Sequence, residues 1–380
     1  MPPTFSPVSS TIEDGTPLSC NSWDSGTSFP SRLQYHFPAN ITDMFLNSCI
    51  PPSITGALHV RTGPDAKHIV VDVEVRGQIL SGDQHLEVCM MSRPGPGNYG
   101  LGIYNVSPSN RRIRKIPNRM VRCSPRYPPE SPLDVLIHVV IPHNVSLASL
   151  CTHLPQFSQS LGTPNPPDHK GAPNQTYPLR IGSLSLGGPV SHLTMRMDEV
   201  KKFELDIDAP LRGNLRVSES LSVTSRSSDV SVNITLVNRG NPITVNLEAD
   251  HAPIDTIVKI VNLDTHGHHT TIPFPVHIAA RTTYAPLGMV VAYPSSSPPV
   301  ALFVEAETEL APIVVHLPPA FQGTFNLSAI QSDARVDQST VADPSGKGRT
   351  RTVYVDNGDV DDQRGDPYRG IIWIVLYLHD

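Results

Sequence analysis

The chain has 380 residues, of which 38% are hydrophobic, so it is long enough to enclose a substantial core. Its 39 prolines disfavour long helices, because proline lacks a backbone donor and clashes inside a helix. The net charge of -6 gives little attraction for polyanions, and no window approaches the apolar length of a membrane span. We therefore expect a soluble chain with no nucleic-acid partner and no membrane span.

In chain order, residues 1–52 are rich in Pro, Ser and Thr without sustained periodicity, which predicts a disordered arm. This segment shows no signal-peptide pattern, so the cytoplasm is the expected location. Short β-rich runs between Pro and Gly breaks predict an N-terminal β-rich region over residues 53–157. A loop is expected over residues 158–178, and an adhesin-like β-repeat region over residues 179–380.

The cysteines and the glycosylation sequons indicate opposite compartments. Five cysteines at spacings that match no zinc or redox motif predict buried, reduced thiols: Cys20, Cys49, Cys89, Cys123 and Cys151. Six N-x-[ST] sequons would matter only in a secreted chain, and a Ser/Thr-rich sequence also produces them by chance. They lie at Asn40, Asn105, Asn144, Asn174, Asn233 and Asn326.

A short repeat is the strongest signal in the sequence. The pattern x-Ala-Pro-[Ile/Leu] occurs four times, with its Ala-Pro pairs at Ala209 and Pro210, Ala252 and Pro253, Ala285 and Pro286, and Ala311 and Pro312. A degenerate copy lies at Ser227-Ser228-Asp229-Val230. Spacings of 19 to 33 residues between these copies are typical of stacked supersecondary units.

Each position of the repeat has a physical reason. Proline fixes φ where the chain corners, alanine allows a close backbone approach, and Ile or Leu opens the next buried strand. One strand–corner–strand unit cannot bury its own apolar face, so neighbouring units must stack. We expect an all-β, solenoid-like stacked-strand array, and a β-sandwich that reuses Ala-Pro in its turns is the alternative.

The repeat resembles that of a fungal family of unknown function, typical of basidiomycete genomes, which reads approximately Thr-Ser-Asn-Ala-Pro-Ile. It is also similar to bacterial adhesin-like β-repeats. The resemblance covers about residues 179–373 and is most specific at residues 248–254, 280–287 and 317–328. It includes Gly323 in a Gly-Thr-Phe strand and Trp373 in a late Gly-x-x-Trp strand. It implies a fold, and neither an activity nor a cofactor.

The chain departs from that family in two ways. Asp, His, Tyr or Leu replaces the Asn of the repeat, and the final Ser-Asn-x-Pro strand is absent after Trp373. From this second departure we expect a truncated or mis-spliced C-terminus. An apolar edge over residues 371–378 would then be exposed to aggregation.

Paired carboxylates are the only enzyme-like feature. Asp206 and Asp208 are two apart on an expected strand, so both side chains point to one face, as glycoside hydrolysis requires. A solvated sheet face explains them better, because Glu305 and Glu307 repeat the spacing without a supporting His or Arg.

Other local clusters are better explained as polar loops. They are His266-Gly267-His268-His269 with Asp264 for a metal, the acidic run 356–362 for calcium, the Arg364-Gly365-Asp366 tripeptide, and the basic run 111–115 followed by Arg119 and Arg122 for anions. We expect no catalytic residue, metal or cofactor. The sequence favours a non-catalytic, adhesin-like binding or scaffold module with a protein or polysaccharide partner, and a parallel β-helix carbohydrate-active enzyme is the alternative.

Overall fold

The structure is a computed structural model. It describes residues 15–23, 31–38, 40–50, 54–63, 66–77, 85–106, 133–162, 179–188, 199–207, 209–262, 275–292, 302–308, 311, 313–316, 324–329, 353–356 and 370–375. Strands make up these residues almost entirely, and none of the described residues is helical. The predicted all-β, stacked-strand class is confirmed.

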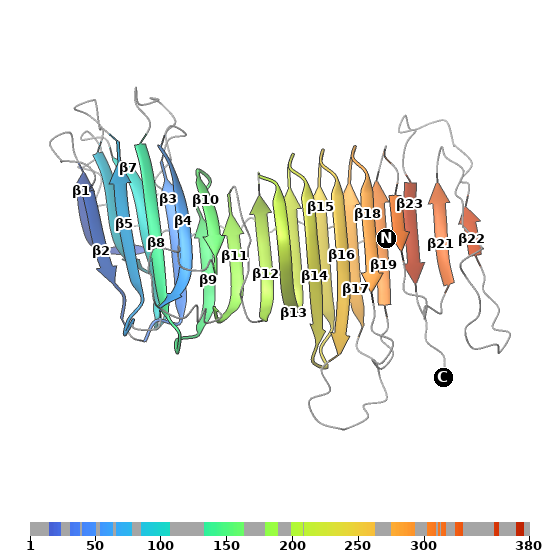
Figure 1. The fold of residues 1–380 in the computed structure, drawn as a ribbon, viewed down its shortest axis with the longest axis horizontal. Helices are drawn as coiled ribbons and strands as arrows, with labels where there is room; N and C mark the ends of the chain where they lie inside the picture. The colour runs from blue at the N-terminus through green and yellow to red at the C-terminus, as the bar shows by residue number, and fades with distance from the viewer. Residues whose placement is uncertain are drawn as a thin grey trace, which may run out of the picture.

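Ten strands form the N-terminal part: β1 (Thr16–Trp23), β2 (Ser31–His36), β3 (Asp43–Cys49), β4 (Ile54–Gly63), β5 (Val70–Arg76), β6 (His85–Ser92), β7 (Asn98–Val106), β8 (Leu133–Pro142), β9 (Leu147–His153) and β10 (Phe157–Leu161). One sheet has the order β10-β4-β8-β5-β2. On the opposite side, β1, β6, β7, β3 and β9 are hydrogen-bonded neighbours. Figure 1 shows these strands at one end of an elongated molecule.

The remaining strands continue the array: β11 (Ile181–Gly187), β12 (Val200–Ile207), β13 (Leu211–Ser225), β14 (Val230–Asn238), β15 (Ile243–Ala249), β16 (Ile254–Asn262), β17 (Val276–Thr282), β18 (Leu287–Ala292), β19 (Leu302–Thr308), β20 (Ile313–His316), β21 (Thr324–Ala329), β22 (Val353–Asp356) and β23 (Gly370–Val375). β9 pairs with β11 in parallel, so the two parts share one sheet.

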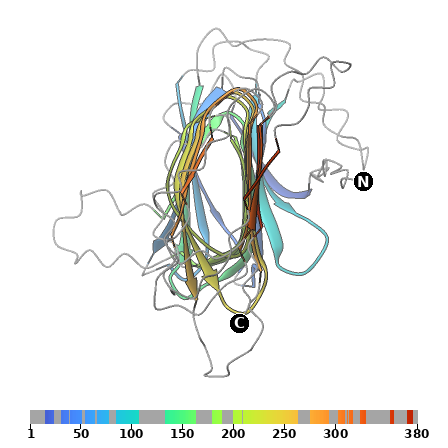
Figure 2. The ribbon, with the colours of Figure 1, turned by 90° about the vertical axis from the view of Figure 1, so that its right-hand side faces the viewer.

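From β13 onward the chain alternates between two layers. Layer A contains β12, residues 220–225 of β13, β15, β17 and β19, and its strands pair in parallel. Layer B contains residues 211–217 of β13, β14, β16, β18 and β20, also parallel. Strands β13 to β18 therefore each pair with the strand two places further along the chain. Beyond them, β23 pairs antiparallel with β19 and β21. The end view in Figure 2 shows the two layers facing each other.

The core lies between the layers because alternate side chains of each strand point inward. β14 and β15 begin with the burial patterns BeBeB and BeBiB, the two-residue period of a half-buried strand. One continuous hydrophobic cluster extends from Trp23 to Ala306. Along layer B, the inward residues that open successive strands pair in register: Leu211, Val230, Ile254, Leu287 and Ile313.

The expectation of disorder is wrong over much of residues 16–49. β1, β2 and β3 all lie there, and Trp23, Phe45 and Leu46 are each at most 2% exposed. The physical reason is that β1 pairs with β6, far away in sequence, so its order does not depend on local apolar periodicity. Residues 1–14 lie outside the described residues.

The loop expected over residues 158–178 is also wrong at its start. β10 occupies Phe157–Leu161 and pairs in parallel with β4. Phe157 and Leu161 are fully buried, which is what orders this serine-rich segment. Residues 163–178 lie outside the described residues.

Candidate binding faces

The corners of the array are hydrogen-bonded from one unit to the next. The Val230 nitrogen donates to the Pro253 carbonyl at 3.0 Å, and the Ile254 nitrogen donates to the Pro286 carbonyl at 3.2 Å. The Leu211 nitrogen donates in the same way to the carbonyl of Asp229 at 2.9 Å, so the degenerate copy occupies an equivalent corner. Proline loses no ladder bond here, because only its carbonyl is used.

At two of the corners the alanine faces inward and the residue before it faces outward. Ala252 and Ala285 are 2% and 5% exposed. The preceding His251 and Tyr284 stack on the outside with ring centroids 4.9 Å apart. Three other residues of the expected repeat lie within the described residues: Ala209, Pro210 and Ala311. Pro312 and Gly323 lie outside them. For Trp373, which lies in β23, only the backbone is described.

A buried hydroxyl ladder beside these corners was missed at the sequence level. Ser225, Ala249, Thr282 and Thr308 pair in register at the ends of successive layer A strands. The Thr282 hydroxyl donates to the Ala285 carbonyl, the Ser225 hydroxyl donates to the Ser228 carbonyl at 2.6 Å, and the Thr308 hydroxyl accepts from the Ala311 nitrogen at 3.2 Å. The available signal was a Ser or Thr three residues before the central residue of three corners.

The outer face of layer A carries mostly polar and charged side chains, with short ones on β13 and at Thr244 and Asn246 of β15. Three rows cross it in strand register. They are Lys202–Ser220–Thr244–His277–Phe303, Glu204–Ser222–Asn246–Ala279–Glu305 and Asp206–Thr224–Glu248–Arg281–Glu307. Neighbouring strands lie about 4.8 Å apart, so each row presents groups at a regular spacing. His277 and Phe303 stack at one end, with centroids 4.6 Å apart.

An ion cluster lies at that same end of layer A. Arg281 contacts Glu305 at 2.6 Å and Glu307 at 3.3 Å. Although burial lowers the pKa of Arg281, its hydrogen bond to Glu305 and the nearby carboxylates raise it overall. The expectation that Glu305 and Glu307 lack a supporting Arg is therefore wrong. Arg281 comes from the neighbouring strand, which the spacing within one strand does not show.

Asp206 lies at the opposite end of its row. Its neighbours on the adjacent strands are Gly187 of β11 and Thr224 of β13, so neither brings a second carboxylate into register beside it. Asp208 lies outside the described residues. The convergence of acids that a glycosidase would need is not provided by the adjacent described strands at this position.

The outer face of layer B is different in character. Asn233 donates from Nδ2 to Asn214 Oδ1 at 3.0 Å, and a shallow depression lies around this pair, bordered by Arg212, Asp255 and Ile257. Ile257 is 46% exposed and Val314 52% exposed. Exposed apolar side chains therefore lie on this face beside the polar groups that line the depression.

The N-terminal five-stranded sheet carries a row of polar groups across its outer face. Ser160, His59, His138, Asp72 and Gln34 occupy one register position on β10, β4, β8, β5 and β2. The hydroxyl of Ser160 lies 2.6 Å from His59 Nδ1, and the His59 and His138 rings stack at 5.1 Å. Burial lowers the pKa of both histidines, and the adjacent His59 lowers that of His138 further.

Asp72, the fourth residue of this row, forms an ion pair with Arg32. Arg32 contacts Asp72 Oδ2 at 2.8 Å, and Gln34 Nε2 donates to Oδ1 at 2.9 Å. With both carboxylate oxygens engaged, Asp72 is held in place beside His138. The sequence offered no signal for this row, because its members come from five strands.

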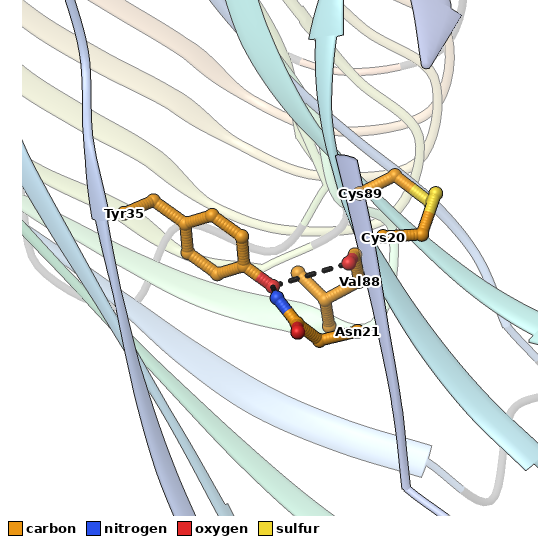
Figure 3. Close-up of a disulfide and its surroundings, with 5 residues drawn as sticks. All are labelled: Cys20, Asn21, Tyr35, Val88 and Cys89. Atoms are coloured by element: carbon orange, nitrogen blue, oxygen red, sulfur yellow. Dashed lines mark hydrogen bonds between the residues drawn. A yellow bond between two sulfur atoms is a disulfide. The ribbon is translucent and has the colours of Figure 1, made fainter. Parts of the chain in front are cut away.

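The cysteine expectation is wrong for three of the five residues. Cys20 and Cys89 face each other on β1 and β6 and form a disulfide, and Cys49 is also disulfide-bonded. Figure 3 shows the Cys20–Cys89 bond beside Tyr35, whose hydroxyl accepts from Asn21 at 3.1 Å and donates to the Val88 carbonyl at 3.1 Å. Cys151 is a free thiol whose pKa is raised by burial.

One group of possible metal ligands occurs among the described residues. Ligand atoms of Cys20, Glu87 and Cys89 lie within 4.8 Å of one another. Both sulfurs are consumed by the disulfide, so the group does not offer the thiolates that a metal would need. The other clusters noted in the sequence lie outside the described residues. They are His266, His268 and His269 with Asp264, the Arg364-Gly365-Asp366 tripeptide, the basic run, and the acidic run apart from Asp356.

The chain was compared with protein families, curated proteins and solved structures. No family model and no curated protein matches the chain. Among solved structures, a candidate adhesin from Bacteroides fragilis NCTC 9343 is 8% identical with a TM-score of 0.23, over 76% of this chain and 96% of that one. A candidate cell adhesion protein from Clostridium sporogenes ATCC 15579 is 8% identical with a TM-score of 0.24, over 76% and 99%. Scores this low carry no argument about fold or function. Among the described residues no helix is long and apolar enough to span a membrane.

Proposed function

We propose that the protein is a non-catalytic, adhesin-like binding or scaffold module whose contact surface is the outer face of layer A. The observation that carries the proposal is the stacking of Ser222, Asn246 and Ala279 with their neighbouring rows in strand register. The short side chains of β13 and of Asn246 project little from the middle of this face. The regular strand spacing suits an extended partner with its own repeat, such as a polysaccharide or an extended protein segment.

The disulfide supports a location in an oxidising compartment, in place of the cytoplasm expected from the sequence. Disulfides persist in secreted and cell-surface proteins and are rare in the cytosol. Cys20 and Cys89 lie on directly paired residues, so the bond closes without moving the strands. A binding module in such a compartment would meet extracellular polymers.

A glycan array and a polysaccharide pull-down with the full chain test this function. We expect specific retention, and an at least tenfold loss in a Ser222→Lys/Asn246→Lys variant, because two long charged side chains would stand on the outer face of layer A. A Ser231→Lys/Thr235→Lys variant places the same charges on the outer face of layer B and serves as the matched control. Equal loss in both variants would contradict the choice of face.

The alternative is a carbohydrate-active enzyme that uses Asp206. It is tested with a reducing-sugar release assay on the retained polysaccharides. Sugar release that disappears in Asp206→Ala would establish the enzyme and overturn the non-catalytic module. Retention without release supports the module.

A further inference from the structure

Two glycosylation sequons lie on exposed turns at the same end of neighbouring strands. Asn40 of Asn40-Ile41-Thr42 is exposed just before β3. Asn144 of Asn144-Val145-Ser146 is exposed in the turn between β8 and β9, which is closed by the Val145 nitrogen donating to the Pro142 carbonyl at 3.0 Å. β3 and β9 pair in parallel, and the Ala148 nitrogen donates to the Thr42 carbonyl at 2.7 Å.

In both sequons the asparagine points outward while its neighbour holds the turn. Ile41 is 4% exposed, and Val145 packs against the main core. An N-linked glycan is bulky and hydrophilic, so it is compatible with a fold only where the asparagine side chain projects into solvent. Exposed turns also tolerate added bulk better than strand interiors.

Asn233 gives an internal contrast. Its sequon lies in the middle of β14, and its amide nitrogen donates to Asn214 at 3.0 Å. A glycan there would leave Nδ2 a single N–H beside Asn214 and would lie over the shallow depression on the outer face of layer B. For Asn105, Asn174 and Asn326, the side chains lie outside the described residues.

We propose that Asn40 and Asn144 carry N-linked glycans and that Asn233 does not. The donor is an oligosaccharide on a lipid diphosphate. Asparagine Nδ2 bonds to the anomeric carbon of the first sugar, the bond from that carbon to the diphosphate oxygen breaks, and the amide loses one proton. The inference rests on the oxidising compartment of the proposed function, because sequons are read in the secretory pathway, where disulfides also form.

The two glycans would project from one end of β3 and β9, in the N-terminal part of the molecule. The outer faces of layers A and B lie further along the array, as Figure 1 shows. Glycosylation at these positions would therefore shield strand ends and turns and leave the proposed binding face open.

The test is peptide mass spectrometry of the full chain isolated from its source cells, with enzymatic deglycosylation in ¹⁸O-water. We expect ¹⁸O-labelled Asp at positions 40 and 144 and an unmodified Asn233. Asn144→Gln and Thr42→Ala should each remove one glycan from the intact mass, and Thr42→Ser should keep it. If Thr42→Ala does not fold, Asn40→Gln replaces it.

The state of the Cys20–Cys89 disulfide distinguishes failure of the glycan assignment from failure of the compartment assignment. An unmodified Asn40 or Asn144 in protein with an intact Cys20–Cys89 disulfide overturns the assignment of that site and leaves the compartment standing. Occupancy of Asn233 overturns the structural criterion. If Cys20 and Cys89 are reduced in the isolated protein and no glycan is present, both this inference and the oxidising compartment fail.

Discussion

At the scale of single residues, buried polar groups in the array are satisfied by the corners. Thr282 is 4% exposed, and its hydroxyl donates to the carbonyl of Ala285 at the following corner. A buried carbonyl left without a donor costs about 1–3 kcal/mol. The hydroxyl ladder therefore fixes the corner geometry in addition to the packing of the alanine.

Thr282→Val keeps the shape of the side chain and removes the donor. We expect it to lower the free energy of unfolding by about 1–3 kcal/mol, measured by urea denaturation. Thr282→Ser retains the hydroxyl and should lie closer to the wild type. If the serine variant loses as much as the valine variant, the methyl contacts and not the hydrogen bond would explain the effect.

His59 and His138 make stability depend on pH. Both pKa values are lowered in the folded protein, so the unfolded chain, whose histidines titrate near about 6.5, takes up protons first as the pH falls. The free energy of unfolding should be highest above about pH 7 and should decrease towards pH 5. Urea midpoints of the wild type and of His59→Gln at several pH values measure this dependence.

His59→Gln should reduce that pH dependence, because it removes one of the two stacked rings. Thr244→Gln, which places the same amide side chain on the outer face of layer A and removes no titrating group, is the control and should leave the slope unchanged. The same slope in the wild type and His59→Gln would assign the effect to other groups.

At the scale of elements, β1 makes little contact with the core. Of its residues only Trp23 is buried, and β1 is ordered by pairing with β6 and by the Cys20–Cys89 bond. Such an edge strand would otherwise detach easily, since few apolar contacts hold it. The disulfide fixes β1 to its neighbour β6, as the corner hydrogen bonds fix each unit of the array to the next.

A Cys20→Ser/Cys89→Ser variant tests this dependence. The two cysteines are 69 residues apart, and opening a loop of that length corresponds to about 4 kcal/mol of unfolded-state entropy. We expect a lower urea midpoint and faster hydrogen exchange over Thr16–Trp23 than elsewhere. Cys151→Ser removes the half-buried free thiol and should not speed exchange over Thr16–Trp23. Protected β1 amides in the double variant would refute the role of the disulfide.

At the scale of the whole molecule, the units from β13 to β20 contact their neighbours in the same way. β13 pairs with β15 and β15 with β17 in one register, and the same holds for β14, β16 and β18. Stability should therefore be close to a sum of unit and neighbour contributions, as in other stacked arrays. Removal of one complete unit should be tolerated.

Deletion of residues 244–276 removes β15 and β16 in phase. His277 then follows Ile243 and takes the place of Thr244 opposite Ser220. We expect a folded β-rich protein by circular dichroism with a cooperative thermal transition. An out-of-phase deletion one residue shorter should fail, because a one-residue slip turns inward side chains outward. Equal behaviour of the two deletions would contradict the register.

The sequence alone determined the strand-rich class and the spacing of the corners, because alternation and turn chemistry act over a few residues. Tertiary structure decided the rest. Three features join strands that are separate in sequence. They are the pairing of β1 with β6, the row from Ser160 to Gln34, and the contact of Arg281 with Glu305. Their formation depends on loop closure and on packing between layers, and neither leaves a local pattern in the chain.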